Sequence, residues 1–387
     1  MKLNLRQARL VTLFLVVALT AGGMGYWWGT RTAAFPKPVL DHQLDFSLFW
    51  NVWERLGATY IDKQALDPQQ MVYGSIEGMV AALNDPYTVF LTPKNNDEAK
   101  QRLNGSFEGV GMELGYRDEI LAVIAPLPGT PAERAGIRAG DLIIKIEDQE
   151  TTSVSLPEAV ELIRGPAGTA VKLTLLHQNE TEFYEVSVVR EKIVVPSVEI
   201  SFEDNVAHLA LLSFGDRTNQ EWLGAVNQIV ARRPKGIVLD LRNNTGGYLS
   251  GAVFVASEFL TDGVVVQQEF SDGHRENLAV DRQGKLRDYP LVVLINQGSA
   301  SAAEIVAGAL RDYDRATLVG ETSFGKGSVQ EAQELPGGAG LHITTARWLL
   351  PKGDSIDKQG IEPIVKIKDD LETETDEQWE KAKSLLS

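Results

Sequence analysis

The pattern of apolar and polar positions divides the chain into segments of different character. The first apolar segment, from Leu10 to Trp28, is uncharged and follows the basic residues Lys2, Arg6 and Arg9. Its length suits either a secretory signal or a short membrane span. No small-x-small cleavage site closes it, and it ends in aromatic residues typical of a membrane interface. We therefore expect residues 1–31 to be an uncleaved signal anchor, with a cleaved signal peptide as the alternative; either way the body is exported.

The next segment has helical periodicity. Residues 32–40 contain two prolines and are expected to be a linker, whereas residues 41–103 repeat apolar positions at helical spacing. Four aromatic residues fall on one helix face, and we expect them to form part of a core: Phe46, Phe49, Trp50 and Trp53. Residues 71–83 form a second amphipathic run. This part of the chain is therefore predicted to be a helical N-terminal region.

Residues 104–191 have a different pattern and are predicted to be a separate, β-rich domain. A glycine-containing loop at 107–114 enters a strand, residues 129–136 suggest a short helix, and residues 140–146 suggest a strand. Residues 156–165 have the composition of a further helix.

From residue 192 to residue 366 the chain alternates strands and helices, which predicts an α/β domain. Apolar runs at 235–241, 291–295 and 316–320 have strand composition, and residues 248–260 and 304–310 have helical periodicity. Residues 367–387 are expected to be an acidic, helical C-terminal tail.

Composition narrows the functional classes. The 387 residues are enough for two or three cores, and the net charge of −16 makes nucleic-acid binding an unfavourable interpretation. The chain has no cysteine, so it has no disulfide, thiol nucleophile or lipoprotein-type lipid attachment.

Candidate chemistry begins at Ser301. This residue follows the apolar run 291–295 and precedes the helical run 304–310, so it lies at a strand-to-helix turn. Helix N-terminal amides at such a turn are able to stabilise a developing oxyanion. The alternative is structural, because Ser301 and Glu304 have the spacing of a helix capping box.

A serine nucleophile needs a base. None of the five histidines lies in a glycine-rich turn or beside a small-residue elbow, which disfavours a Ser-His-Asp triad. Lys326 lies between two glycines, and burial would lower its pKa enough for it to accept a proton. Gln330, four residues later, is placed to hold the amine. The alternative for Lys326 is an ordinary solvated lysine.

A nucleotide-binding alternative comes from the same segment. Residues 320–326 have the G-x-x-x-x-G-K spacing of a phosphate loop and follow a strand. However, Gly327 occupies the position where Ser or Thr would bind magnesium, and residues 328–340 do not have the pattern of an amphipathic helix.

The motifs Asn296–Glu304 and Phe324–Gln330 together resemble those of the carboxy-terminal processing proteases, also called tail-specific proteases. The resemblance implies a Ser-Lys dyad in which Ser301 is the nucleophile, Lys326 the general base and Gln330 its orienter. This family often has serine where this chain has Ala303, a position that is not the nucleophile.

The resemblance covers about residues 41–387 and implies a crotonase-like α/β core with an inserted PDZ domain. The turn Arg242–Gly247 resembles the family's oxyanion element, which implies an oxyanion hole made by Gly246 or Gly247 together with Ala302. Residues 104–191 resemble a PDZ domain, which would bind a peptide as an added strand. The implied peptide-binding residues are Gly109, Val110, Gly111, Met112 and Arg164.

The implied function is a serine endopeptidase that cleaves near the C-termini of exported proteins without a cofactor. Its body would lie on the periplasmic side of a bacterial cytoplasmic membrane, anchored through residues 10–28. The expected partners are protein substrates with free C-termini, and family members also form homodimers or larger assemblies or require an activating partner. The alternative from another functional class is a catalytically silent PDZ scaffold.

Overall fold

The computed structural model describes residues 45–117, 120–177, 180–368, 373 and 375–386, in two compact units, residues 1–71 and 72–387. The expected signal anchor and linker lie outside the described residues. In the described part of the first unit, helix α2 spans Ser47–Thr59 and the 3₁₀ helix η1 spans Lys63–Ala65. Among the described residues, no helix is long and apolar enough to cross a membrane.

The prediction that the aromatic residues of α2 form a core is wrong. The helix buries none of its residues, and the side chains of Phe46 and Trp50 are 58% and 55% exposed. The aromatic rings contact one another instead, for example Phe49 and Trp53 at 6.2 Å between ring centroids. Contacts between side chains of the same helix do not bury an apolar face, which requires packing against another element.

Helix α3 (Pro68–Ala81) crosses the boundary between the two units, and α4 spans Pro93–Leu103. Between them lies a strand that the helical prediction missed, β1 (Val89–Leu91), which pairs antiparallel with β18 (Gly340–Leu349). Phe90 is buried with Val80 and Ala339 in a small cluster. Pairing with a distant strand therefore overrides the helical pattern around it.

Residues 106–194 form the β-rich part of the second unit. Its main sheet has six strands, five of them in the order β3-β4-β5-β7-β8 and the sixth, β6, paired with β5. The elements are β2 (Ser106–Gly109), β3 (Met112–Arg117), β4 (Ile120–Pro126), α5 (Pro131–Arg134), β5 (Leu142–Ile146), β6 (Gln149–Glu150), η2 (Thr151–Ser153), α6 (Leu156–Ile163), β7 (Ala170–Leu176), β8 (Tyr184–Val189) and β9 (Glu191–Val194). Strands β2 and β9 pair antiparallel, so the segments that enter and leave this part lie side by side.

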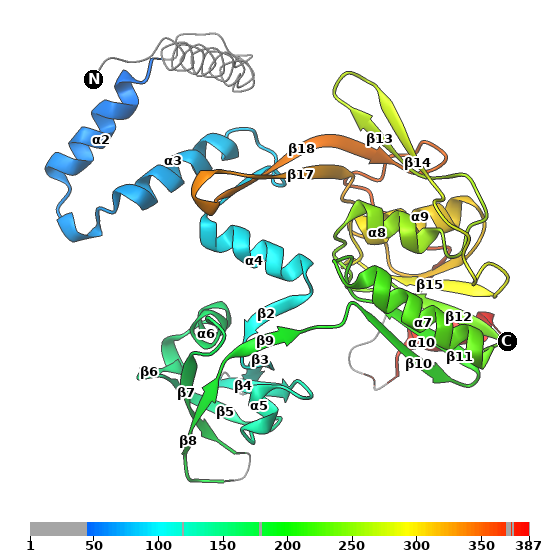
Figure 1. The fold of residues 1–387 in the computed structure, drawn as a ribbon, viewed down its shortest axis with the longest axis horizontal. Helices are drawn as coiled ribbons and strands as arrows, with labels where there is room; N and C mark the ends of the chain where they lie inside the picture. The colour runs from blue at the N-terminus through cyan, green and yellow to red at the C-terminus, as the bar shows by residue number, and fades with distance from the viewer. Residues whose placement is uncertain (1–44, 118–119, 178–179, 369–372, 374, 387) are drawn as a thin grey trace, which may run out of the picture. The chain divides into compact units, whose positions relative to one another are not determined.

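The remaining elements build the α/β core. They are β10 (Val198–Glu203), β11 (Val206–Leu211), α7 (Thr218–Arg232), β12 (Gly236–Asp240), α8 (Leu249–Ala256), β13 (Val264–Phe270), β14 (Arg275–Ala279), β15 (Leu291–Ile295), α9 (Ala302–Asp312), β16 (Thr317–Gly320), β17 (Ser328–Glu334), η3 (Pro336–Gly338), β19 (Val365–Lys366) and α10 (Glu377–Leu385). Figure 1 shows them as a group of strands flanked by helices. Strands and helices alternate from β11 to β13 and from β15 to β16, whereas β13 to β15 and β16 to β18 follow one another without an α-helix between them.

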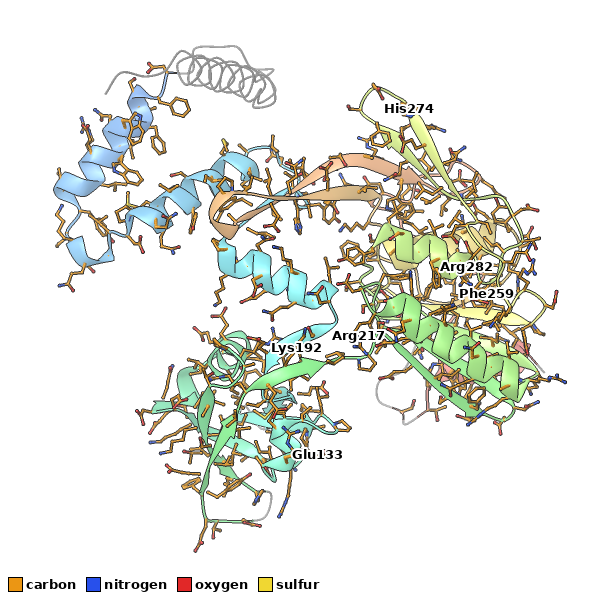
Figure 2. The ribbon with its side chains drawn as sticks, in the orientation of Figure 1. Glu133, Lys192, Arg217, Phe259, His274 and Arg282 are labelled. Carbon is orange, nitrogen blue, oxygen red and sulfur yellow. The ribbon has the colours of Figure 1, made fainter. Side chains whose placement is uncertain are left out.

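The central sheet of the core has the order β10-β11-β12-β15-β16-β19, parallel from β11 onward. Alternate residues of its strands bury against opposite layers. Leu239 and Val293 pack with α7, α8 and α9, whereas Val238 and Val292 pack with Trp379 of α10. Phe259, which follows α8 and is labelled in Figure 2, packs edge-on against Trp222 of α7 in the same buried cluster as Leu239 and Val293.

A second sheet, β1-β18-β13-β14 with β17 beside β18, adjoins this core. Strands β17 and β18 form a long hairpin (Figure 1). Strand β17 directly follows the Lys326 loop, and β18 pairs with β1. The hairpin therefore connects the Lys326 loop to β1.

Helix α10 also packs directly on the core, through an ion-pair network. Arg242 donates to the carboxylates of Asp240 at 2.7 Å and Asp376 at 2.8 Å, and to Gln378 at 3.2 Å. His208 lies 3.1 Å from Asp240. The predicted C-terminal tail contains helix α10, which packs on the sheet and contacts the turn that carries Gly246.

Candidate active site

Three loops that carry the predicted catalytic residues leave neighbouring strands of the central sheet. The glycine turn follows β12, Ser301 follows β15, and Lys326 lies in the loop after β16. These strands are parallel and adjacent, so their carboxyl ends lie at one edge of the sheet. Ligand and catalytic sites of α/β sheets lie at this edge. The topology therefore brings segments that are far apart in sequence to one place.

Ser301 has an unusual backbone conformation, with φ 54° and ψ −116°. Non-glycine residues rarely adopt positive φ, and such strain costs on the order of 1–3 kcal/mol. The glycine turn fits closely against it: a Cβ at Gly246 would lie 2.8 Å from Ser301 Cβ and 3.0 Å from the nitrogen of Ala302. Only glycine allows this approach.

A buried carboxylate joins the Ser301 turn to the Lys326 loop. Glu304 has no exposed surface and accepts hydrogen bonds from four donors. They are Ser301 N at 2.8 Å, Ser323 Oγ at 2.6 Å, Gly325 N at 2.7 Å and Lys326 N at 3.0 Å. Burial raises the pKa of Glu304, although these donors oppose the shift. The capping interaction predicted from the Ser301–Glu304 spacing is one part of this larger network.

The side chain of Lys326 is half-buried, and burial lowers its pKa, while the charges of Asp85 and Glu304 act in the opposite direction. Its Nζ atom lies 4.9 Å from the ring centroid of Tyr87. Among the described residues, Nζ has no hydrogen-bond or ion-pair partner, and none joins it to Ser301 Oγ. The loop therefore holds a partly desolvated amine, the property that a lysine base requires.

Gln330 lies on β17, and its amide nitrogen donates to Ser328 Oγ at 2.9 Å and Thr344 Oγ1 at 3.1 Å. The amide oxygen, to which an amine would donate, has no partner in the described parts of the chain. The side chain is thus fixed by its nitrogen, with its oxygen left as an acceptor.

The two candidate oxyanion glycines differ in the use of their N–H groups. Gly246 N donates to Asn244 Oδ1 at 2.9 Å, and Asn244 is itself held by Leu211 O. Within the described residues, neither Gly247 N nor Ala302 N donates a hydrogen bond. Gly247 is exposed, whereas Gly246 is buried. The available donor pair is therefore Gly247 and Ala302, with Gly246 shaping the turn.

The predicted peptide-binding residues lie around a pocket of about 130 Å³ between the edge strand β3 and helix α6. Its lining includes Gly109, Val110, Gly111, Met112 and Arg164. Gly111 has φ +77°, and a Cβ there would lie 2.5 Å from Thr130, so the loop requires glycine. Among the described strands, β3 pairs on one side only, so its other edge is able to pair with an added strand.

Two arginines near the end of α6 have different environments. Arg190 is buried and donates to the carbonyls of Ile163 at 2.8 Å, Leu162 at 2.9 Å and Ala170 at 2.7 Å. Arg164 is exposed and lies over the ring of Phe107 at 4.7 Å. The cation that caps the helix C-terminus is therefore Arg190, and the side chain of Arg164 is directed to the pocket.

The phosphate-loop alternative does not fit the geometry. The N–H groups of Gly325 and Lys326, which would have to hold a phosphate, are bonded to the Glu304 carboxylate. The loop leads into strand β17 and not into a helix.

Several residues of the site were not found from the sequence. The sequence pattern predicts Glu304 only as a capping residue, and Tyr87 is not among the predicted site residues. The S-x-x-E spacing was the available signal for Glu304. No sequence signal pointed to Arg190, because its partners are backbone carbonyls.

The comparisons with known proteins agree on one family. A model described as peptidase family S41 matches residues 205–367, and a PDZ domain model matches residues 123–176. The carboxy-terminal processing protease CtpA of Bacillus subtilis is 34% identical over 366 residues, covering 94% of this chain and 78% of the relative. The carboxyl-terminal-processing protease of a Picosynechococcus species is 34% identical over 409 residues, covering 98% and 96%.

A solved structure extends the similarity to the fold. The photosystem II D1 C-terminal processing protease superposes with a TM-score of 0.51 at 30% identity, covering 83% of this chain and 92% of that chain.

Proposed function

Because the chain belongs to the carboxy-terminal processing proteases of peptidase family S41, we propose that it cleaves exported proteins near their C-termini with Ser301 and Lys326. Membership makes the protein a serine peptidase. The observation that supports Ser301 and Lys326 as the catalytic pair is the Glu304 carboxylate. It accepts hydrogen bonds from the backbone N–H groups of both residues. A shared anchor of this kind keeps the two segments in a fixed relation.

In the proposed mechanism, Ser301 Oγ attacks the scissile carbonyl carbon while Lys326 Nζ accepts its proton. The carbonyl oxygen becomes an oxyanion that the N–H groups of Gly247 and Ala302 stabilise. The lysine then gives the proton to the leaving amine, which departs as the C-terminal fragment. Lys326 Nζ then takes a proton from a water molecule, which hydrolyses the acyl-enzyme and restores Ser301.

Lys326 must be neutral to start this sequence. Its burial lowers its pKa and so increases the neutral fraction near physiological pH. The free amide oxygen of Gln330 is proposed to accept a hydrogen bond from the amine and to orient it toward Ser301 Oγ.

The pocket between β3 and α6 is proposed to read the substrate terminus. Apolar lining from Val110, Leu156 and Val160 suits an apolar terminal side chain, and the Gly109–Gly111 loop suits a carboxylate bound by backbone amides. Arg164 adds a cation at the rim of the pocket. The name of the D1 C-terminal processing protease supports action at a protein C-terminus.

The location and assembly are proposed from the sequence. Residues 10–28 would anchor the protein in the membrane with its body outside the cytoplasm, and dimers, larger assemblies or an activating partner are consistent with the family. Fractionation with membranes, resistance to carbonate extraction and access of external protease to the body would support the anchor. A soluble form that begins after about residue 21 would instead show a cleaved signal.

The decisive experiment compares exported proteins from cells that carry the wild-type enzyme or Ser301→Ala. Mass spectrometry should find proteins whose C-termini are longer in the variant strain. Identical C-termini in both strains would contradict C-terminal processing, and purified enzyme that still hydrolyses peptide would then indicate an endopeptidase of another specificity.

A further inference from the structure

The Lys326 ammonium group lies over the aromatic ring of Tyr87, at 4.9 Å from Nζ to the ring centroid. Tyr87 belongs to the turn before β1, far from Lys326 in sequence. The ring is half-buried, and it lies beside an amine that has no polar partner within the described residues. The contact therefore needs an explanation beyond the packing of one side chain.

The turn that carries Tyr87 is fixed by hydrogen bonds on both sides of the ring. Asp85 accepts from Tyr87 N at 3.0 Å and from Thr88 Oγ1 at 2.7 Å. Thr88 Oγ1 in turn accepts from Thr344 N on β18 at 3.0 Å. Thr344 is also the residue whose hydroxyl contacts the Gln330 amide. The turn is thus attached to the hairpin that follows the Lys326 loop.

Strand pairing adds a second attachment. Val89, two residues after Tyr87, pairs with His342 of β18, and Phe90 with Leu341. Phe90 is buried. The backbone on the C-terminal side of Tyr87 is therefore held in register with β18.

Two effects of the ring on the amine oppose each other. An aromatic face attracts an ammonium group by roughly 0.5–2 kcal/mol, which favours the charged form. The same ring excludes water, and loss of hydration favours the neutral form. Burial dominates at Lys326, since its pKa is lowered although the charges of Asp85 and Glu304 raise it.

The other titratable groups around the amine are on different elements. Asp85 precedes the ring, Glu304 lies on α9, and His342 lies on β18. Burial lowers the pKa of His342, and so does the charge of Lys326. Burial raises the pKa of Tyr87, and so do the charges of Asp357, Glu304 and Asp85.

We propose that Tyr87 is a positioning residue of the active site, whose ring holds the Lys326 amine and shields it from water. The turn Asp85–Thr88 is then a structural part of the catalytic site and not only the end of the helical region. This inference rests on the proposed role of Lys326 as the base.

The test uses Tyr87→Phe, Tyr87→Leu and Tyr87→Ala in the full chain. The measurements are kcat and KM for a peptide substrate from pH 6 to pH 10. Tyr87→Ala should lower kcat at pH 7 by about tenfold or more, with KM nearly unchanged, and should move the rise of kcat with pH to higher pH. Tyr87→Leu should give a smaller displacement, because it keeps an apolar group but no aromatic face. The conservative variant Tyr87→Phe should keep most of the wild-type activity and the wild-type pH profile.

A second readout separates the base from peptide binding. The rate at which a fluorophosphonate labels Ser301 depends on the base and needs no peptide, so its pH profile should move in the same direction as that of kcat. Repeating the series with His342→Asn removes the histidine that titrates nearby. Thermal melting of each variant identifies loss of folding, and Tyr87→Leu and Tyr87→Phe remain informative if Tyr87→Ala unfolds.

Two results would overturn the inference. One is a loss of kcat by the same factor at every pH in Tyr87→Leu and Tyr87→Ala, with an unmoved labelling profile. The other is a Tyr87→Phe variant as impaired as Tyr87→Leu, which would assign the effect to the hydroxyl. Failure of the dyad itself is distinguishable, because Lys326→Ala would then keep its activity.

Discussion

The Ser301–Lys326 region and the pocket between β3 and α6 are built in contrasting ways. In the first, a fully buried carboxylate, Glu304, accepts four hydrogen bonds from two loops. In the second, an edge strand and a short helix enclose a small, partly apolar pocket, and Arg164 at its rim is exposed. The contrast agrees with the role proposed for each region.

Proton transfer and nucleophilic attack depend on atoms held within tenths of an ångström. A buried carboxylate with several donors gives that precision, since each donor would be costly to leave unsatisfied. Reading a peptide terminus requires an open strand edge and a pocket of about the right size, which tolerates different side chains. We therefore expect substitutions in the first region to reduce kcat and substitutions in the second to depend on the substrate.

The largest effects are expected for the proposed dyad. Ser301→Ala and Lys326→Ala should each lower peptide hydrolysis by at least about 1000-fold while the fold is retained, because they remove the nucleophile and its base. The double variant should be little worse than either single variant, since the two groups act as a unit. Steady-state kinetics with matched circular dichroism spectra provides the measurement. A single variant that keeps more than about 10% of wild-type turnover would make the dyad assignment wrong.

The next largest effect is expected for Glu304→Gln. The glutamine amide presents an NH₂ group to at least one of the four donors, so a buried hydrogen bond is lost at a cost of about 1–3 kcal/mol. We expect kcat to fall by about 10- to 100-fold with little change in KM, together with a lower midpoint of urea unfolding.

The control for Glu304 is Glu258→Gln, also a fully buried carboxylate of the core but bonded to Arg282 and Lys285 N. It should lower stability and leave the kcat of the remaining folded enzyme close to that of the wild type. Equal losses of kcat in both variants would show that Glu304 acts through general stability alone.

A smaller, substrate-dependent effect is expected for Arg164→Ala. If the guanidinium reaches a bound carboxylate, cleavage of peptides with free C-termini should fall by about tenfold, with little change in thermal stability. Amidating the peptide C-terminus should cause a similar loss in the wild type and add little in the variant.

Arg190→Gln is the matched control, because the Arg190 guanidinium caps α6 by donating to the last carbonyls of that helix. This substitution should mainly lower the free energy of unfolding, by about 1–3 kcal/mol. Equal sensitivity of the wild type and Arg164→Ala to amidation would show that Arg164 does not contact the substrate carboxylate.

The smallest effect is expected for Lys326→Met, as a gain in stability. Burial lowers the pKa of Lys326 in the folded protein, so the protonated lysine destabilises the fold at neutral pH. Urea unfolding should show the variant more stable than the wild type by about 0.5–1 kcal/mol at pH 7. The difference should shrink as the pH rises through the lowered pKa toward 10.5, the ordinary value, where the lysine is neutral in both states. A difference that is constant with pH would assign the gain to packing instead.

Much of the local structure followed from the sequence. The apolar run Leu291–Ile295 forms β15 as predicted, and the helical run after it forms α9. The spacing of Ser301 from its strand and of Lys326 from its glycines was enough to place both in loops at strand ends. These features depend on residues that are neighbours in the chain, so periodicity and turn chemistry report them.

Only the tertiary structure shows that the N–H group of Gly246 is occupied by Asn244 Oδ1, which is why Gly247 is the glycine proposed for the oxyanion hole. It also decided that Glu304 joins two loops, that Tyr87 faces Lys326, and that Arg190 rather than Arg164 caps α6. It left the aromatic face of α2 exposed, where helical periodicity predicted a core. Each of these outcomes depends on which distant segments lie beside a residue in the folded chain, and periodicity along the chain carries no information about such contacts.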